Sequence, residues 1–102
     1  MTEETENKAA ETSTSTLTLS NGTKVTINEP TTPQILKARN FAVKDKDAGK
    51  TYLYLIAECC KFDGKIVPAP EIMKLRPRDY LAIENVVRDF LGENDEDDEK
   101  NG

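Results

Sequence analysis

The sequence predicts a small α+β domain, in which an N-terminal β-hairpin packs on three α-helices, placed between two disordered acidic ends. Three observations support this prediction. Residues 16–28 alternate apolar and polar side chains with the period of a half-buried strand. Three later segments, beginning near Thr32, Lys50 and Pro77, place apolar residues at helical spacing. The charge is also segregated, because the two ends of the chain hold all of its net negative charge.

The charge distribution sets the expected domain boundaries. The 102-residue chain has room for one domain and carries a formal net charge of −5. Residues 1–16 contribute −3 and residues 93–102 contribute −5, which leaves +3 for residues 17–92. Both ends lack the apolar residues that would offset the entropy of ordering them. The expected organisation is a disordered tail over 1–15, one domain over 16–92 and a second disordered tail over 93–102.

The hairpin is the first predicted element. Its apolar positions alternate with threonine and lysine, and they are Leu17, Leu19, Val25 and Ile27. Asn21 and Gly22 supply the two residues with positive φ that a type I′ turn requires. Two strands alone are marginal in water, so the apolar face of the hairpin has to pack on the rest of the domain.

Two helices are predicted next. Thr32 is expected to cap the first and Pro33 to open it, since the N–H that proline lacks has no partner there. The polar residues 44–49 end this helix. The second helix is expected from about Lys50 to Lys61, with Asp63-Gly64 as its stop. Apolar side chains cover more than half of its circumference, so it is either central to the core or partly buried by another protein.

The last third of the chain is predicted to hold one further helix. Pro68 and Pro70 are expected to exclude a helix through Pro70. A short turn is then expected to dock on the core through Ile72, Met73 and Leu75. Pro77 opens the final helix, with Asp79 near the positive end of its dipole, and Gly92 ends it. The apolar stripe of this helix comprises Tyr80, Ile83, Val87, Phe90 and Leu91.

Residues suited to catalysis or metal binding are few. The chain has no histidine, which removes the commonest general base and transition-metal ligand. Its five glycines stand apart, so no phosphate-binding loop is present. The acids Asp45, Asp47 and Asp63 lack the spacing of a calcium loop. The adjacent Cys59 and Cys60 are expected to be buried thiols. We therefore expect a protein that is not an enzyme and that binds no cofactor or metal.

Nucleic acid and membranes are also disfavoured as partners. The basic residues around the last helix are Lys74, Arg76, Arg78 and Arg88, but acids share that helix and the core charge of +3 is weak for neutralising phosphates. A small DNA-binding regulator is thus the least favoured alternative. The longest apolar run, residues 53–57, is far too short to span a bilayer. The N-terminus lacks the features of a signal peptide, so a cytoplasmic location is expected.

The order of short motifs carries a resemblance that covers roughly residues 17–92. A hairpin is followed by Glu-Pro-Thr-Thr, a helix, a second apolar helix, and a step through Ile72, Leu75 and Asp79 into a helix ending at Phe90-Leu91. This order resembles that of the tail assembly chaperones of Mu-like and P2-like contractile-tailed bacteriophages.

The resemblance implies a non-catalytic role in the cytoplasm of the bacterial host. Such chaperones bind the long helical tape-measure protein and keep it soluble while tail-tube subunits polymerise around it, so the tape-measure protein is the expected partner and the tail-tube protein the second. Aromatic and aliphatic anchors dominate interface energies, and those predicted here are Phe41, Tyr52, Tyr54, Leu55 and Phe62. The alternative is a structural or connector component that the virion retains.

Overall fold

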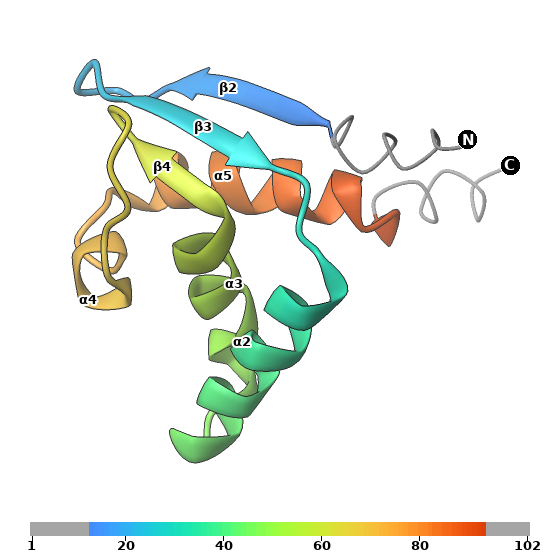
Figure 1. Cartoon of the computed structure of the whole chain (residues 1–102). Coiled ribbons are helices and arrows are strands. Elements are labelled where there is room, and N and C mark those ends of the chain that lie inside the picture. The colour runs from blue at the N-terminus through green and yellow to red at the C-terminus, as the bar shows by residue number, and fades with distance from the viewer. Residues whose placement is uncertain (1–12, 94–102) are drawn as a thin grey trace, which may run out of the picture.

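The computed structural model describes residues 13–93 of the chain (Figure 1). The α+β class is confirmed, with three strands and four α-helices over these residues. Residues 1–12 and 94–102 of the predicted tails lie outside the described residues. Thr14 and Ser15 were predicted to be disordered, but they belong to the first strand. In chain order the elements are β2 (Thr14–Thr18), β3 (Lys24–Asn28), α2 (Thr32–Lys44), the 3-10 helix η1 (Ala48–Lys50), α3 (Thr51–Cys59), β4 (Cys60–Phe62), α4 (Ala69–Ile72) and α5 (Pro77–Phe90).

The predicted hairpin is confirmed, but its turn is of a different type. β2 and β3 pair antiparallel, with Leu17 opposite Val25. Only Gly22 in the connecting loop has a positive φ, at 92°, whereas a type I′ turn needs two such residues. The Leu19 N–H donates to the Thr23 carbonyl at 2.8 Å, and the Gly22 N–H donates to the Leu19 carbonyl at 2.9 Å. The loop is therefore the three-residue kind, with glycine in the left-handed position.

A third strand occupies residues that we predicted to be helical. α3 ends at Cys59, and β4 pairs antiparallel with β3, so that Cys60 lies opposite Ile27 and Phe62 opposite Val25. The helix predicted to reach Lys61 is thus two residues too long. The chain changes to a strand because the free edge of β3 offers unpaired N–H and C=O groups, and pairing with them satisfies both backbones.

A type I′ turn follows β4. Asp63 and Gly64 have φ values of 53° and 83°, and Phe62 and Lys65 exchange two backbone hydrogen bonds of 2.7 and 3.0 Å across them. We predicted Asp63-Gly64 to be a helix stop, and the same left-handed preference is used here to reverse a strand. The Asp63 carboxylate also accepts from the Lys24 N–H at 3.0 Å, which ties the turn to β3.

Helix α2 begins one residue earlier than predicted, because Thr31 is its N-cap. The Gln34 N–H donates to Thr31 Oγ1 at 3.4 Å, and the Thr31 N–H donates to Gln34 Oε1 at 3.0 Å. This capping box satisfies two N–H groups that the helix leaves free. The small residues Ala38 and Ala42 are buried, which lets α2 pack closely along α3, and the two helices project together away from the sheet (Figure 1).

The prediction that Pro68 and Pro70 exclude a helix is wrong. Pro68 is the N-cap of α4, and Pro70 lies in its first turn. Neither position requires an N–H donor within the helix, so proline is tolerated at both. α5 begins at Pro77 as predicted, and Gly92 follows its end with a φ of 81°.

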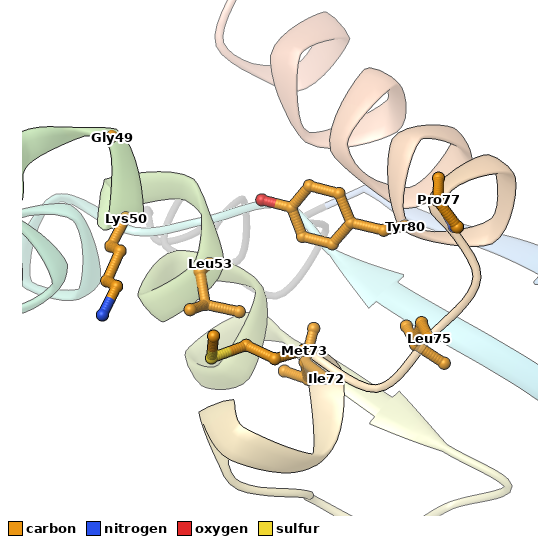
Figure 2. A pocket seen from close by; sticks show the side chains of 8 residues that line it. All are labelled: Gly49, Lys50, Leu53, Ile72, Met73, Leu75, Pro77 and Tyr80. Atoms are coloured by element: carbon orange, nitrogen blue, oxygen red, sulfur yellow. The ribbon is translucent and has the colours of Figure 1, made fainter.

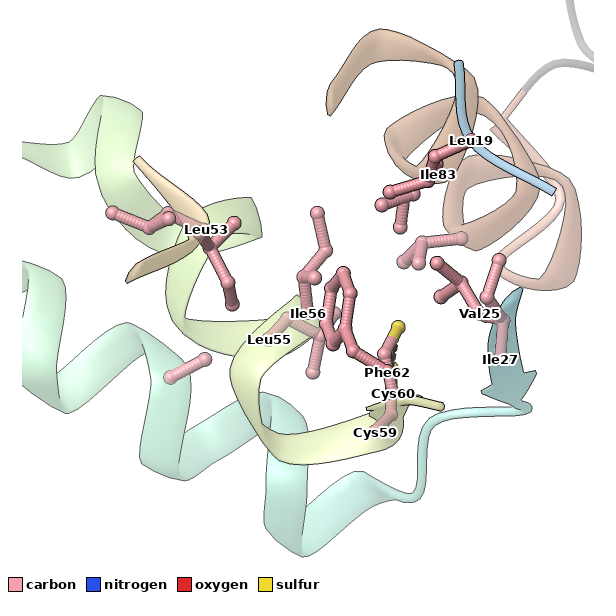
Figure 3. Close-up of a cluster of buried hydrophobic side chains, with 13 residues drawn as sticks. Leu19, Val25, Ile27, Leu53, Leu55, Ile56, Cys59, Cys60, Phe62 and Ile83 are labelled. Carbon is pink, nitrogen blue, oxygen red and sulfur yellow. Dashed lines mark hydrogen bonds between the residues drawn. The ribbon is translucent and has the colours of Figure 1, made fainter. Parts of the chain in front are cut away.

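The core lies between one face of the sheet and the helices α3 and α5 (Figure 3). Val25 and Ile27 of β3 are fully buried in the same cluster as Ile56 of α3 and Ile83 of α5. On the opposite face of the sheet, Lys24 and the threonines of β2 are exposed. The predicted alternation of apolar and polar residues in the hairpin therefore determines that its apolar face packs on the helices.

Asp79 ties the hairpin loop to α5. Its carboxylate accepts from the Ser20 N–H at 3.1 Å and from the Ser20 hydroxyl at 2.7 Å, and the residue is only 7% exposed. We predicted Asp79 as a partner of the helix dipole, and the structure adds this long-range contact. The hydrogen bond from the Ser20 side chain, with smaller effects from Arg76 and Arg78, holds the pKa of Asp79 below its ordinary value.

Two side-chain truncations on α5 should distinguish a core position from a surface position. Ile83→Ala removes a fully buried side chain and should lower the free energy of unfolding by about 2–5 kcal/mol. Leu81→Ala, on the same helix but 52% exposed, should change it by less than about 0.5 kcal/mol. Urea unfolding followed by circular dichroism measures both, and equal losses would contradict the assignment of the core.

Loss of the Asp79 carboxylate should change the acid sensitivity of the fold. A carboxyl group with a lowered pKa stabilises the fold above its unfolded-state pKa of about 3.9, and this contribution is lost as the pH falls through the lower folded pKa. Asp79→Asn should therefore reduce the urea midpoint at pH 7 and weaken its dependence on pH between about 5 and 2. Ser20→Ala should reduce the midpoint less, because the backbone hydrogen bond remains. An unchanged pH profile in Asp79→Asn would contradict this account.

Candidate partner-binding site

An open apolar groove of about 330 Å³ lies between the start of α3, the end of α4 and the first turn of α5. Figure 2 shows the Tyr80 ring extending from α5 toward the start of α3, with the side chains of Leu53, Ile72 and Met73 below it. Its other lining residues are Gly49, Lys50, Leu75 and Pro77. Three elements that are separate in the sequence thus contribute to one concave surface, as is usual for binding sites.

Two proline-opened helices shape this groove. Pro68 and Pro70 begin α4, which lasts a single turn, and Pro77 begins α5 after a short link. The Leu75 N–H still donates to the Ile72 carbonyl at 3.1 Å, so the chain turns tightly before it leaves α4. Opposite, the Asp47 side chain caps η1 by accepting from the Gly49 N–H at 3.0 Å. The backbone on both sides of the groove is therefore fixed by local hydrogen bonds.

Neighbouring residues in the groove differ sharply in exposure. Ile72 is buried against the core, whereas the next residue, Met73, is 61% exposed. Leu75 and Tyr80 are half-buried. Methionine is unbranched and polarisable, so it adapts to partners of different shape. An exposed methionine beside a half-buried tyrosine and leucine is the composition expected of a surface that a partner covers.

The groove is nearly free of formal charge. Lys50 is the one charged residue among its eight lining residues, and its Nζ lies 3.5 Å from Asp45 Oδ2. Burial, followed by hydrogen bonding to Glu84, raises the pKa of Tyr80 above its usual value. The Tyr80 hydroxyl is therefore a hydrogen-bond donor at neutral pH rather than a nucleophile or base.

A second cluster joins α3 to the end of α5 around Arg88. Its guanidinium lies 4.4 Å from the centre of the Tyr52 ring and within 2.9 Å of both Glu84 and Glu93. The Tyr52 hydroxyl donates to Glu93. Burial and then this hydrogen bond raise the pKa of Tyr52 to about 12. The charges of this cluster are satisfied among its own members, so it supports the packing of α5 rather than presenting reactive groups.

The five predicted anchor residues do not form one surface. Leu55 and Phe62 are 2% and 9% exposed and belong to the core, so the prediction that they contact a partner is wrong for this structure. Tyr52 is engaged with Arg88. Phe41, 37% exposed, and Tyr54 form a tilted aromatic pair with ring centroids 5.3 Å apart, on the α2–α3 side of the molecule. This pair stays a predicted contact surface.

Sequence reasoning missed the groove itself. Its residues are Leu53, Ile72, Met73, Leu75 and Tyr80 with their neighbours, and we had assigned most of them to the core. The apolar run on both sides of Lys74, close behind two prolines, was the one signal in the sequence, because a short element cannot bury apolar residues on every side.

Over residues 13–93, no group of three or more histidine, cysteine, aspartate or glutamate side chains is placed to hold a metal ion. Cys59 and Cys60 are both buried, with their Sγ atoms 3.8 Å apart. The hydrogen bond between the two thiols lowers the pKa of Cys59 and, together with burial, raises the pKa of Cys60, which disfavours the thiolate of Cys60.

The chain matches no model of a protein family, no curated protein and no solved structure. Within the described residues, none of the helices is both long and apolar enough to cross a membrane.

Alkaline titration should report the environment of the tyrosines. The chain has three, and the fold raises the pKa of each: Tyr52 and Tyr80 first through burial, and Tyr54 first through its hydrogen bond to Asp45. Because the neutral form is favoured in the fold, stability should fall as the pH rises above about 10. As the pH is raised, absorbance at the tyrosinate band should increase at a higher pH in the folded protein than in the urea-unfolded chain. Coincident titration curves would contradict these assignments.

Proposed function

We propose that this protein is a non-catalytic binding domain that holds an apolar helical segment of a partner protein in the groove beside Met73. The observation that carries the proposal is the open apolar lining, in which Met73 is exposed next to the buried Ile72. Grooves of this kind accept the apolar face of an amphipathic helix, whose anchors recur at every third and fourth residue.

The resemblance of residues 17–92 to phage tail assembly chaperones supports a specific form of this proposal. The partner is the tape-measure protein, which is long, helical and prone to aggregate until tail-tube subunits surround it. The chain binds it in the cytoplasm of the bacterial host and is released as the tube grows. The tail-tube protein is the second proposed partner.

The physical properties of the chain suit this role. A client that exposes apolar helices aggregates unless those faces are covered, and the groove offers a surface to cover them. The acids concentrated in residues 1–16 and 93–102 add net negative charge, which keeps a protein and its complexes dispersed. Neither property needs a catalytic residue.

Coexpression with a tape-measure protein encoded in the same genome tests the proposal. The full chain should raise the soluble fraction of the tape-measure protein and copurify with it. Met73→Glu should weaken the complex by about fivefold or more, because it places a charge at a central apolar contact. Val43→Glu changes a residue that is 71% exposed and lies on α2, outside the groove lining, and should leave binding unchanged.

Two outcomes would reject the proposal. A tape-measure protein that stays aggregated in the presence of the full chain rules out a chaperone for this client. Recovery of the chain in purified virions favours instead a structural or connector component. Circular dichroism of both variants establishes that they fold before binding is compared.

A further inference from the structure

The rim of the groove carries positive charge. Between α4 and the first turn of α5 the sequence reads Lys74-Leu75-Arg76-Pro77-Arg78, in which Leu75 and Pro77 line the groove and the three basic residues are exposed. Lys50 lines the opposite side (Figure 2). An apolar surface is therefore bordered by cations from two separate parts of the chain.

These cations are only weakly engaged within the protein. Lys74 Nζ lies 3.4 Å from Glu71 Oε2, and Lys50 Nζ lies 3.5 Å from Asp45 Oδ2, both in pairs with considerable solvent exposure. Such exposed pairs contribute little and exchange partners readily. Arg76 and Arg78 act on Asp79 electrostatically, but the oxygens of that carboxylate accept hydrogen bonds from Ser20.

We propose that the groove selects an amphipathic helix that carries acidic residues beside its apolar anchors. This inference rests on the proposed function for the existence of a helical client, and it adds the chemistry of the segment that binds. An apolar side chain of the client would contact Met73, Leu75 and Tyr80. Aspartate or glutamate three or four residues away lies on the same side of the client helix and would face Lys50, Arg76 or Arg78.

The alternative polyanion, a nucleic acid, fits this surface less well. Phosphates would neutralise the rim, but they would leave the exposed Met73 and the half-buried Leu75 and Tyr80 in contact with water. A helix with both apolar and acidic residues satisfies the lining and the rim together. Charges at a rim mainly set specificity and the association rate, so the preference for acid should weaken as salt rises.

Two fluorescent peptides test the inference on the full chain. Each is a helix of about 18 residues, or five turns, with leucine along one face; one carries glutamate beside the leucines and the other carries lysine. Fluorescence anisotropy at low salt should show tighter binding of the glutamate peptide, by about tenfold. This preference should shrink in high salt.

Two double variants with the same change in charge test whether the preference for the glutamate peptide arises at the rim of the groove. Arg76→Glu combined with Arg78→Glu should abolish or reverse the preference for the glutamate peptide. Lys24→Glu combined with Lys61→Glu makes the same charge change on exposed residues of the sheet and should retain most of it. Circular dichroism confirms that both fold, and urea midpoints check that neither is destabilised.

Three results would overturn the inference. One is equal affinity for the two peptides in low salt, and another is an equal loss of preference in both double variants. The third is the finding that a single-stranded oligonucleotide of matched charge binds as tightly as the glutamate peptide and displaces it. Solubilisation of the tape-measure protein without any charge preference would reject this inference alone. A preference for the glutamate peptide without solubilisation would reject the chaperone proposal alone.

Discussion

The central strand β3 is the constraint on which the rest of the structure depends. It pairs with β2 on one side and β4 on the other, so among the strands of residues 13–93 it alone has both edges hydrogen-bonded. Its side chains Val25 and Ile27 are fully buried between the sheet and the helices. A strand fixed at both edges and on one face determines where α3 ends, because the next residues of the chain must complete its ladder.

The position of the groove follows from this arrangement. Because the chain enters β4 at Cys60, it returns through the Asp63-Gly64 turn and reaches α4 beside α3. Ile72 then joins the core, while Met73 and Leu75 lie at its edge. The tie from Asp79 to Ser20 and the Arg88 cluster fix the two ends of α5. The groove therefore lies at the edge of the core, where α3, α4 and α5 meet, and its lining comes from these elements.

The charge of the chain has a spatial order that its net value of −5 conceals. The acids at its ends are separated in sequence from a mildly basic domain. Within that domain, the residues from Lys74 to Arg78 alternate groove-lining and exposed positions. This alternation places apolar contact and positive charge next to each other. The proposed binding of an apolar client needs apolar contact for affinity and charge for specificity, and this surface has both.

The sequence by itself determined the α+β class, the β2–β3 hairpin and α5, because periodicity and the proline and glycine positions are local signals. It did not determine β4 or the burial of Leu55 and Phe62, because an apolar residue looks the same whether it lies in the core or at an interface. The C-terminal end of α3 and the type I′ turn were decided by pairing with β3, which lies more than 30 residues earlier in the chain. Only the tertiary structure brought Leu53, Met73 and Tyr80 to one groove. Local propensity does not indicate which apolar residues of separate segments will pack near one another, and long-range packing decides this.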